Sequence, residues 1–172
     1  MKSPSTTDLR LEVNGRMVRS ATPSDFPAIN GLLEQVDDLH VGWYPEYFRS
    51  VDPPARSDKH LTFWLEDPAR EVLLAFDGIG LAGLAMLVLE RPSGIPLLQD
   101  FPYVLIDNLV VDQSARGKGI GKALVEASQL WAKDLGVTQV QLKVYDKNQG
   151  AMKFYDHIGF EPLAHRLKLD LE

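Results

Sequence analysis

The sequence predicts one α/β (α+β) domain in which strands and helices follow in the order β, α, several β, α, β, α and β. Two hairpin signals support this class: Asn14-Gly15 lies between alternating segments, and DGIG at residues 77–80 joins the apolar runs EVLLAF and LAGLAMLVLE. A third observation is the stretch 103–135, an apolar strand that runs through a glycine-rich turn into an amphipathic helix. With 172 residues, 45% of them hydrophobic, the chain can bury one full core.

The first half of the chain contains two expected helices. The first should begin at Thr22, a capping hydroxyl before proline, and should end near Leu39. Residues 40–48, which Gly and Pro interrupt, form either a core plug or a pocket wall. A proline-rich loop at residues 51–57 then precedes a short second helix.

In the second half, residues 91–102 form a loop that leads into the central strand. Gly136 is the expected stop of the central helix, and residues 137–145 alternate as a strand with one buried face. A short helix should end at Gly159, and the tail at residues 165–171 alternates again as a strand.

Composition excludes several classes of protein. The net charge of −6 argues against non-specific nucleic-acid binding, which depends on Lys and Arg. The absence of cysteine excludes disulfides, thiolate metal sites and a cysteine nucleophile. The four histidines, at positions 40, 60, 157 and 165, have no ligand-like spacing, so we expect no metal. Neither a signal peptide nor a membrane-spanning run is evident, so we expect a cytoplasmic protein without a membrane partner.

The glycine-rich turn after the central strand suits a phosphate. A helix start presents backbone N–H groups and a positive dipole end, and glycines let the ligand approach the backbone closely. A Walker loop does not fit, because Ala123 replaces the hydroxyl residue and Arg116 occupies the position of the first glycine. A dinucleotide fingerprint does not fit either, because Lys122 occupies the position of its third glycine.

The pattern Arg116-x-x-Gly119-x-Gly121 resembles the pyrophosphate-binding motif of the GNAT superfamily of acyl-CoA N-acyltransferases. The resemblance extends to the strand LIDNLVVD, the strand QLKVY, Asn148 and the segment FYDHIGF, and covers residues 17–171 in the family's order. It implies a GNAT fold with a central mixed, mostly antiparallel, twisted sheet flanked by helices. Residues 1–16 are then an N-terminal extension with a candidate leading strand, and residues 17–172 are a single N-acetyltransferase domain.

The resemblance also implies acetyl-CoA as co-substrate. The pyrophosphate would lie in the turn, the pantetheine arm would pair with the backbone of the central strand, and an amide and a phenol on the following helix would contact the cofactor. The residues implied are Leu109, Val110, Val111, Arg116, Gly117, Lys118, Gly119, Ile120, Gly121, Lys122, Asn148 and Tyr155. Asn148 is alternatively a helix cap.

Two residues are candidates for proton transfer. Asp107 lies inside an apolar run, where a carboxylate must be paired or functional; it is either the general base carried over from the family or a structural carboxylate. Tyr155 resembles the family tyrosine that protonates the departing thiolate, and a core aromatic is the alternative.

Acceptor binding is expected from His40, Trp43, Tyr44 and Asp107, with an aromatic core cluster as the alternative for the first three. The predicted function is transfer of an acetyl group from acetyl-CoA to a primary amine of a small molecule, peptide or protein, by direct attack. A non-catalytic acyl-CoA-binding or sensing module is the competing function. The final strand is also a candidate for pairing with a second copy in a homodimer.

Overall fold

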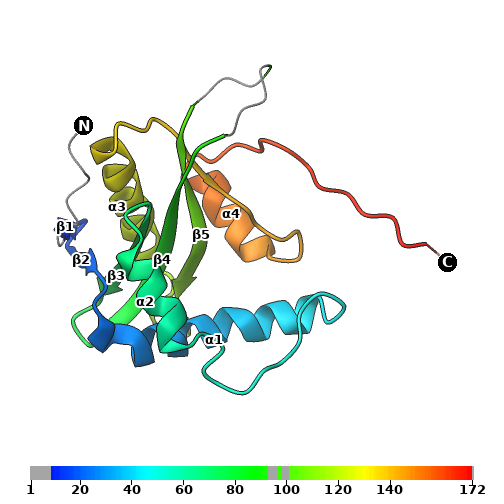
Figure 1. The fold of residues 1–172 in the computed structure, drawn as a ribbon, viewed down its shortest axis with the longest axis horizontal. Coiled ribbons are helices and arrows are strands. Elements are labelled where there is room, and N and C mark those ends of the chain that lie inside the picture. Colours follow the sequence, from blue (N-terminus) through cyan, green and yellow to red (C-terminus); the bar gives the residue numbers. More distant parts are fainter. Residues whose placement is uncertain (1–8, 93–96, 98–100, 172) are drawn as a thin grey trace.

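The computed structural model describes residues 9–92, 97 and 101–171. Six strands form one sheet in chain order (Figure 1). Neighbouring strands are antiparallel except the last pair, which is parallel, so the expected mixed and mostly antiparallel sheet is confirmed. The strands are β1 (Arg10–Val13), β2 (Arg16–Ser20), β3 (Arg70–Phe76), β4 (Leu81–Glu90), β5 (Tyr103–Val111) and β6 (Val140–Leu142).

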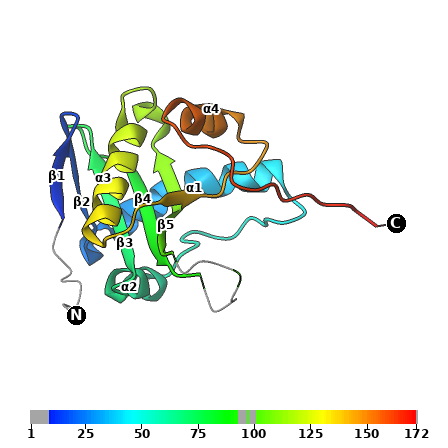
Figure 2. The same cartoon turned by 90° about the horizontal axis from the view of Figure 1, so that it is seen from above.

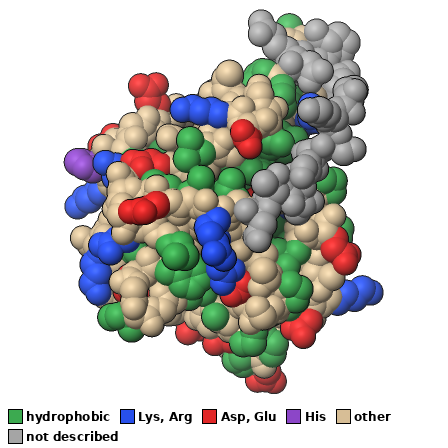
Figure 3. Space-filling view, turned by 90° about the vertical axis from the view of Figure 1, so that its left-hand side faces the viewer, with side chains coloured by type: hydrophobic (Ala, Val, Ile, Leu, Met, Phe, Trp, Pro, Cys, Tyr) green, Lys and Arg blue, Asp and Glu red, His purple; other side chains and the backbone are tan. Residues whose placement is uncertain are grey.

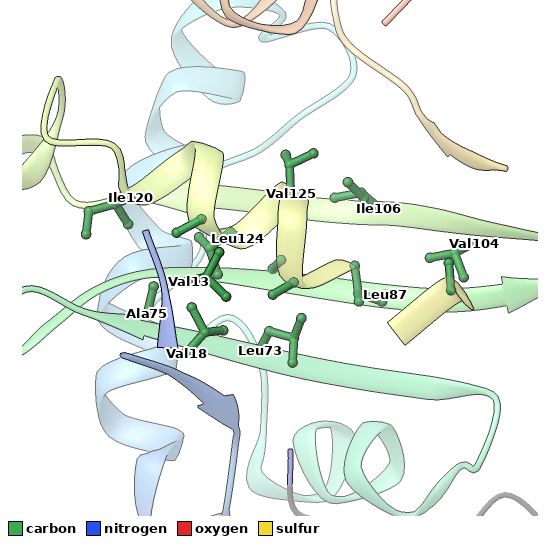
Figure 4. Packing of buried hydrophobic residues seen from close by; sticks show 14 of the residues in the cluster. Val13, Val18, Leu73, Ala75, Leu87, Val104, Ile106, Ile120, Leu124 and Val125 are labelled. Carbon is green, nitrogen blue, oxygen red and sulfur yellow. The ribbon is translucent and has the colours of Figure 1, made fainter. Parts of the chain in front are cut away.

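Four helices cover the two faces of the sheet (Figure 2). They are α1 (Phe26–Trp43), α2 (Asp58–Glu66), α3 (Ile120–Asp134) and α4 (Gln149–His157), with short 3₁₀ turns η1 (Pro23–Asp25) and η2 (Gln113–Ala115). Helices α1 and α2 bury their apolar sides against one face of the sheet. The opposite face packs against α3, with α4 at its margin, and Figure 4 shows Ile120, Leu124 and Val125 of α3 above the strands.

The N-terminal hairpin forms as expected. Asn14 and Gly15 both have positive φ, at 51° and 71°, which is the backbone that a two-residue turn between twisted strands requires. Thr22 begins the helical segment as expected, since Thr22 and Asp25 form a capping box for the 3₁₀ turn η1, and η1 continues directly into α1 at Phe26. Arg19 on β2 makes two hydrogen bonds of 2.8 Å to the Asp25 carboxylate, and its guanidinium lowers the pKa of Asp25 to about 2.

Helix α1 is longer than expected. It continues for one more turn past Leu39 and ends at Trp43. A single glycine lowers helix stability by only about 1 kcal/mol, so Gly42 does not stop it. Pro45 does, because the residue before a proline is forced out of the helical region, and Tyr44 has φ −139° and ψ 62°.

Strand β5 bulges at Asp107. Met86 of β4 pairs with Asn108 and Leu87 pairs with Ile106, so Asp107 has no partner on β4. Strand β6 pairs with Val104–Ile106 of β5 and goes no further. The expected strand at residues 137–145 is therefore only three residues long, and none of those three is fully buried. The pairing of the two parallel strands ends at Ile106 and Leu142, directly before the bulge, and we call this end of the ladder the separation of β5 and β6.

The expected strand at residues 165–171 is wrong. Residues 161–171 belong to no strand and are all exposed, and Figure 1 shows this tail running away from the body of the molecule.

The expected loop at residues 91–102 lies largely outside the described residues. No helix among the described residues is long and apolar enough to cross a bilayer. On the face drawn in Figure 3, Lys and Arg side chains lie among Asp and Glu.

Gly83 on β4 lets α3 lie close to the sheet. A Cβ at this position would come within 2.8 Å of the Val110 carbonyl oxygen and 2.8 Å of the Ile120 side chain. Because one neighbour is backbone, a side-chain rotation cannot relieve the clash. The first turn of α3 is thus set against β4 and β5 by the absence of a single methyl group.

Substitution Gly83→Ala should destabilise the protein by about 1–3 kcal/mol, the usual cost of overpacking a core. Thermal and denaturant unfolding measure it. Gly31→Ala is the matched control, because nothing lies within 4 Å of a Cβ there and α1 should gain slightly in stability. Equal stability of the two variants would contradict the close approach of α3.

Candidate active site

The turn between β5 and α3 forms an open cradle. Asp112 caps η2, accepting hydrogen bonds from the Ser114 N–H at 2.8 Å and the Ser114 hydroxyl at 2.5 Å. The chain then passes through Gly117 and Gly119, which have φ of 75° and 82°. Those left-handed angles are accessible to glycine at little cost, and no atom lies within 4 Å of where their Cβ atoms would be.

The backbone donors of the cradle are available to a ligand. Gly119 is the N-cap of α3 and supplies no side chain, and among the described residues no protein acceptor takes the N–H groups of residues 117–122. Arg116, Lys118 and Lys122 belong to the same segment, and Lys122 Nζ lies 3.9 Å from the Glu126 carboxylate. Arg116 is folded back, with its Nε donating to the Val111 carbonyl oxygen at 3.3 Å. The cradle therefore combines free donors, a helix dipole and three cations, an arrangement suited to an anion.

Two long-range contacts hold the cradle, and the sequence offered no signal for either. Arg16 on the N-terminal hairpin donates to the Lys118 carbonyl oxygen at 3.0 Å. Gln35 on α1 donates to the Asp112 carboxylate at 2.9 Å and accepts from the Gln113 N–H at 3.2 Å. Hydrogen bonds from Ser114 and Gln35 lower the pKa of Asp112 to about 2, so it stays ionised at neutral pH.

Gly121 sets the distance between α3 and α4. A Cβ there would lie 3.1 Å from the ring of Phe154 on α4, so the glycine allows the two helices to approach. Asn148 caps α4 by accepting from the Ala151 N–H at 3.1 Å. Of the two roles considered for Asn148, capping is thus directly observed.

Asp107 is exposed on the bulge of β5, which corrects the expectation that it is buried. A regular strand would send Asp107 and Asn108 to opposite faces, yet the Asn108 amide donates to the Asp107 carboxylate at 2.8 Å. The bulge has turned the two side chains toward one another. Asp107 therefore lies where the sheet opens between β5 and β6, with no burial cost to compensate.

Tyr155 lies on α4 between Phe154 and Phe160, with ring centroids 5.3 Å and 5.6 Å away. Burial raises the pKa of its phenol to about 12. The group is therefore protonated at any ordinary pH and can act as a hydrogen-bond or proton donor to an anion.

Three of the four residues expected to bind the acceptor, His40, Trp43 and Tyr44, lie together at the end of α1. The His40 ring is 4.9 Å from that of Phe48, 5.2 Å from that of Tyr145 and 6.2 Å from that of Trp43. Tyr44 joins the group 5.2 Å from Tyr145. Burial lowers the pKa of His40 and so favours its neutral imidazole. The sequence did not single out Tyr145, which links this aromatic cluster to the segment that leads into α4.

Lysines occupy the aromatic faces of this cluster. Lys147 Nζ lies 4.7 Å from the Tyr44 ring centre and donates to the Trp43 carbonyl oxygen, while Lys143 Nζ lies 5.0 Å from the Tyr145 ring centre. Asp37 of α1, whose charge acts on His40, forms an ion pair with Arg56. That carboxylate is therefore neutralised, and the charges that lie on the aromatic rings are positive.

The expectation of no metal site remains a prediction. Within the described part of the chain, no three His, Asp or Glu residues lie close enough together to hold a metal ion.

Comparison with known proteins assigns the chain to a family. The model of the "Acetyltransferase (GNAT) family" matches residues 33–160, most of the chain, and the chain belongs to that family. N-acetyltransferase 8F1 of Rattus norvegicus is 35% identical over 107 residues, 62% of this chain and 42% of the relative. Mycothiol acetyltransferase of Beutenbergia cavernae is 39% identical over 98 residues, 57% of this chain and 30% of the relative. The chain thus spans less than half the length of these relatives.

Solved structures agree on the fold. A mutant of the BH1408 protein from Bacillus halodurans superposes with a TM-score of 0.86 at 28% identity, covering 90% of this chain and 99% of that one. Aminoglycoside N-acetyltransferase AAC(6')-Iy, solved with a bisubstrate analogue of CoA and acetylneamine, superposes with a TM-score of 0.68 at 19% identity, covering 91% and 98%. The second likeness bears on the fold alone. The GNAT fold inferred from the sequence is confirmed.

Substitution Gln35→Leu should release the cradle from α1. Two hydrogen bonds are lost, at about 0.5–1.5 kcal/mol each, and the Asp112 carboxylate loses a donor. We expect faster amide hydrogen exchange at residues 112–119. Exchange in α2 should be unchanged, because both hydrogen bonds of the Gln35 side chain go to Asp112 and Gln113. Uniformly faster exchange over the whole chain would instead show a general loss of stability.

Proposed function

We propose that this protein is an acetyl-CoA-dependent N-acetyltransferase that acetylates a primary amine. One observation carries the proposal: an open anion cradle at the start of α3 follows directly on β5, the strand whose hydrogen bonds to β6 end early. The cradle suits the pyrophosphate of CoA, and the separated strands leave room for the pantetheine arm to reach the sheet. Membership of an acetyltransferase family supports both assignments.

Within this proposal, the anionic end of acetyl-CoA binds the N–H groups of residues 117–122, with Arg116, Lys118 and Lys122 adding charge. Beyond Ile106 the edge of β5 that faces β6 is unpaired in the described structure, so the backbone of Leu109, Val110 and Val111 is available to the pantetheine amides. A backbone N–H of this edge would polarise the thioester carbonyl, as an oxyanion-type contact does. The complex of AAC(6')-Iy with a bisubstrate analogue that contains CoA supports a CoA site on this fold.

Asp107 and Tyr155 carry the two proton transfers in this proposal. Asp107, exposed where the strands separate, takes a proton from the acceptor ammonium directly or through a water molecule. The free amine attacks the thioester carbon, a C–N bond forms and the C–S bond breaks, and the nitrogen releases its second proton to solvent as the amide forms. Tyr155 donates its proton to the departing CoA thiolate and is restored from solvent. Direct attack requires no acyl-enzyme, and the chain has no cysteine to form one.

The acceptor is expected at the aromatic cluster of His40, Trp43 and Tyr44. Lys143 and Lys147 already occupy ring faces there, and Asp37 is paired with Arg56, so the cluster repels a second cation. Acceptors with a carboxylate near the amine, such as amino acids and peptides, should therefore be preferred over polyamines. Release of CoA thiol from acetyl-CoA, measured with a panel of both kinds, tests the function. Tight CoA binding without turnover of any amine would support the competing sensing module.

Substitution Gly119→Ala should weaken CoA binding about tenfold, because alanine at φ 82° costs roughly 1–2 kcal/mol and shifts the cradle donors. Titration calorimetry with CoA measures the change. Gly136→Ala is the matched control: it has φ 71° and an equally open environment, but lies at the other end of α3. Both variants should lose similar thermal stability, and only the first should lose affinity. Equal affinity in both would remove the cradle as the CoA site.

Substitution Tyr155→Phe should lower kcat at least tenfold and leave KM for acetyl-CoA nearly unchanged, since general acid catalysis typically contributes about 10²–10⁴-fold. Because the pKa of this phenol is about 12, wild-type kcat should show no alkaline decline from Tyr155 below about pH 11. Tyr103→Phe, at the start of β5, is the control and should retain full turnover. Unchanged turnover in the Tyr155 variant would exclude it as the acid.

A further inference from the structure

The hairpin of β1 and β2 reaches the anion cradle through one side chain. Arg16, the first residue of β2, lies beside the turn, and its guanidinium donates a hydrogen bond of 3.0 Å to the Lys118 carbonyl oxygen. The two residues are 102 positions apart in the chain. Arg16 also lies outside residues 33–160, the stretch that the family model matches. The contact thus joins the cradle to a part of the chain that the glycine motif does not include.

The hairpin that carries Arg16 is fixed against α3. Val13 and Val18 are buried in the core cluster to which α3 contributes, and Figure 4 shows both on the side of the sheet that this helix covers. Asn14, at the hairpin turn, donates to the carboxylate of Glu126 on α3. Because the hairpin and the helix share one core, Arg16 extends from a rigid base.

The carbonyl that Arg16 binds belongs to the peptide group between Lys118 and Gly119. This peptide is trans, and in a planar trans peptide the C=O and N–H bonds point in opposite directions. Since the Lys118 oxygen is held toward the hairpin, the Gly119 N–H is directed away from it. Figure 2 shows the hairpin on one side of α3 and β5 on the other, so this N–H is directed toward the β5 side. No acceptor among the described residues takes it, so it is available to a ligand.

The turn by itself allows two orientations of this peptide. Gly119 has φ 82° and ψ 3°, the angles of the third residue of a type II turn. Rotation of the preceding peptide by about half a turn gives a type I turn, in which φ of the third residue is about −90°, and glycine adopts both values with similar ease. In the rotated turn the carbonyl oxygen would point into the cradle and would repel an anion. A contact from outside the turn is therefore needed to select the orientation that binds one.

We propose that Arg16 locks the peptide between Lys118 and Gly119 with its N–H in the cradle, so that the N-terminal hairpin is part of the cofactor site. The inference rests on the proposed function, because the cradle is there the site of the CoA pyrophosphate. Arg16 is a positioning residue that acts through the Lys118 carbonyl. Its charge adds to the effect, since a charged donor at the carbonyl oxygen polarises the peptide and makes its N–H a stronger donor.

Titration calorimetry with CoA measures the effect on the cradle. Arg16→Met keeps an apolar stem and removes the donor, and it should weaken CoA binding about tenfold. Arg16→Lys keeps a cationic donor on a long side chain and should restore most of the affinity. Arg10→Met, at the exposed start of β1, is the matched control: it removes the same charge from the same hairpin and should bind CoA as the wild type does.

Nuclear Overhauser effects in the ligand-free protein report the orientation of the peptide directly. In a type II turn the Lys118 Hα lies close to the Gly119 amide proton, whereas in a type I turn the amide protons of the two residues lie close together. The wild type should show the first contact, and Arg16→Met should gain the second. Arg16→Lys should resemble the wild type.

Three results would overturn the inference. Equal CoA affinity of the wild type and Arg16→Met removes Arg16 from the site. Weaker binding by Arg16→Met, with the turn unchanged in the ligand-free protein, shows that Arg16 contacts a phosphate itself and does not lock the peptide. A wild type that binds no CoA removes the proposed function as well, whereas the first two results leave that function standing. Thermal unfolding of each variant confirms that it is folded.

Discussion

The proposed ligand site depends on the short pairing between β5 and β6. Parallel strands are held together by an even ladder of hydrogen bonds. Here the ladder stops after three residue pairs, immediately before Asp107, which is inserted as a bulge opposite β4. The bulge turns a carboxylate and an amide to one side and leaves the outer half of β5 with an unused edge. In an ordinary sheet an unpaired edge can pair with another chain and cause aggregation. Beside the anion cradle, we propose that it binds an extended ligand.

The cradle itself depends on contacts that are distant in sequence. Its glycines make the turn possible, but Arg16 from the first hairpin and Gln35 from α1 determine where the turn sits relative to the sheet. Gly83 and Gly121 act differently, because each allows a neighbouring element to approach within van der Waals contact. Backbone donors are effective toward an anion only when they are held still, and these four residues hold the first turn of α3 from several sides.

Positive and negative side chains occupy different parts of the proposed site. The cradle and the aromatic cluster both carry lysines, while Asp107 is a single exposed carboxylate between the separating strands. A cationic acceptor would meet the lysines on the rings of the cluster, whereas Asp107 would attract it. This arrangement underlies the proposed preference for an acceptor whose amine is accompanied by an anionic group, which the acidic net charge of the chain would not have suggested.

Most of the elements and the cradle could be predicted from the amino-acid sequence, because hairpin turns, helical periodicity and a glycine motif are local signals. Asn14-Gly15, Thr22 and Gly119 act within a few residues of themselves, and the structure has them as expected. The length of β6, the exposure of Asp107 and the course of the tail became known only from the tertiary structure. Each of these depends on whether another strand lies alongside. Residues 165–171 have the alternating pattern of a strand, but in the folded chain they pair with no other strand among the described residues.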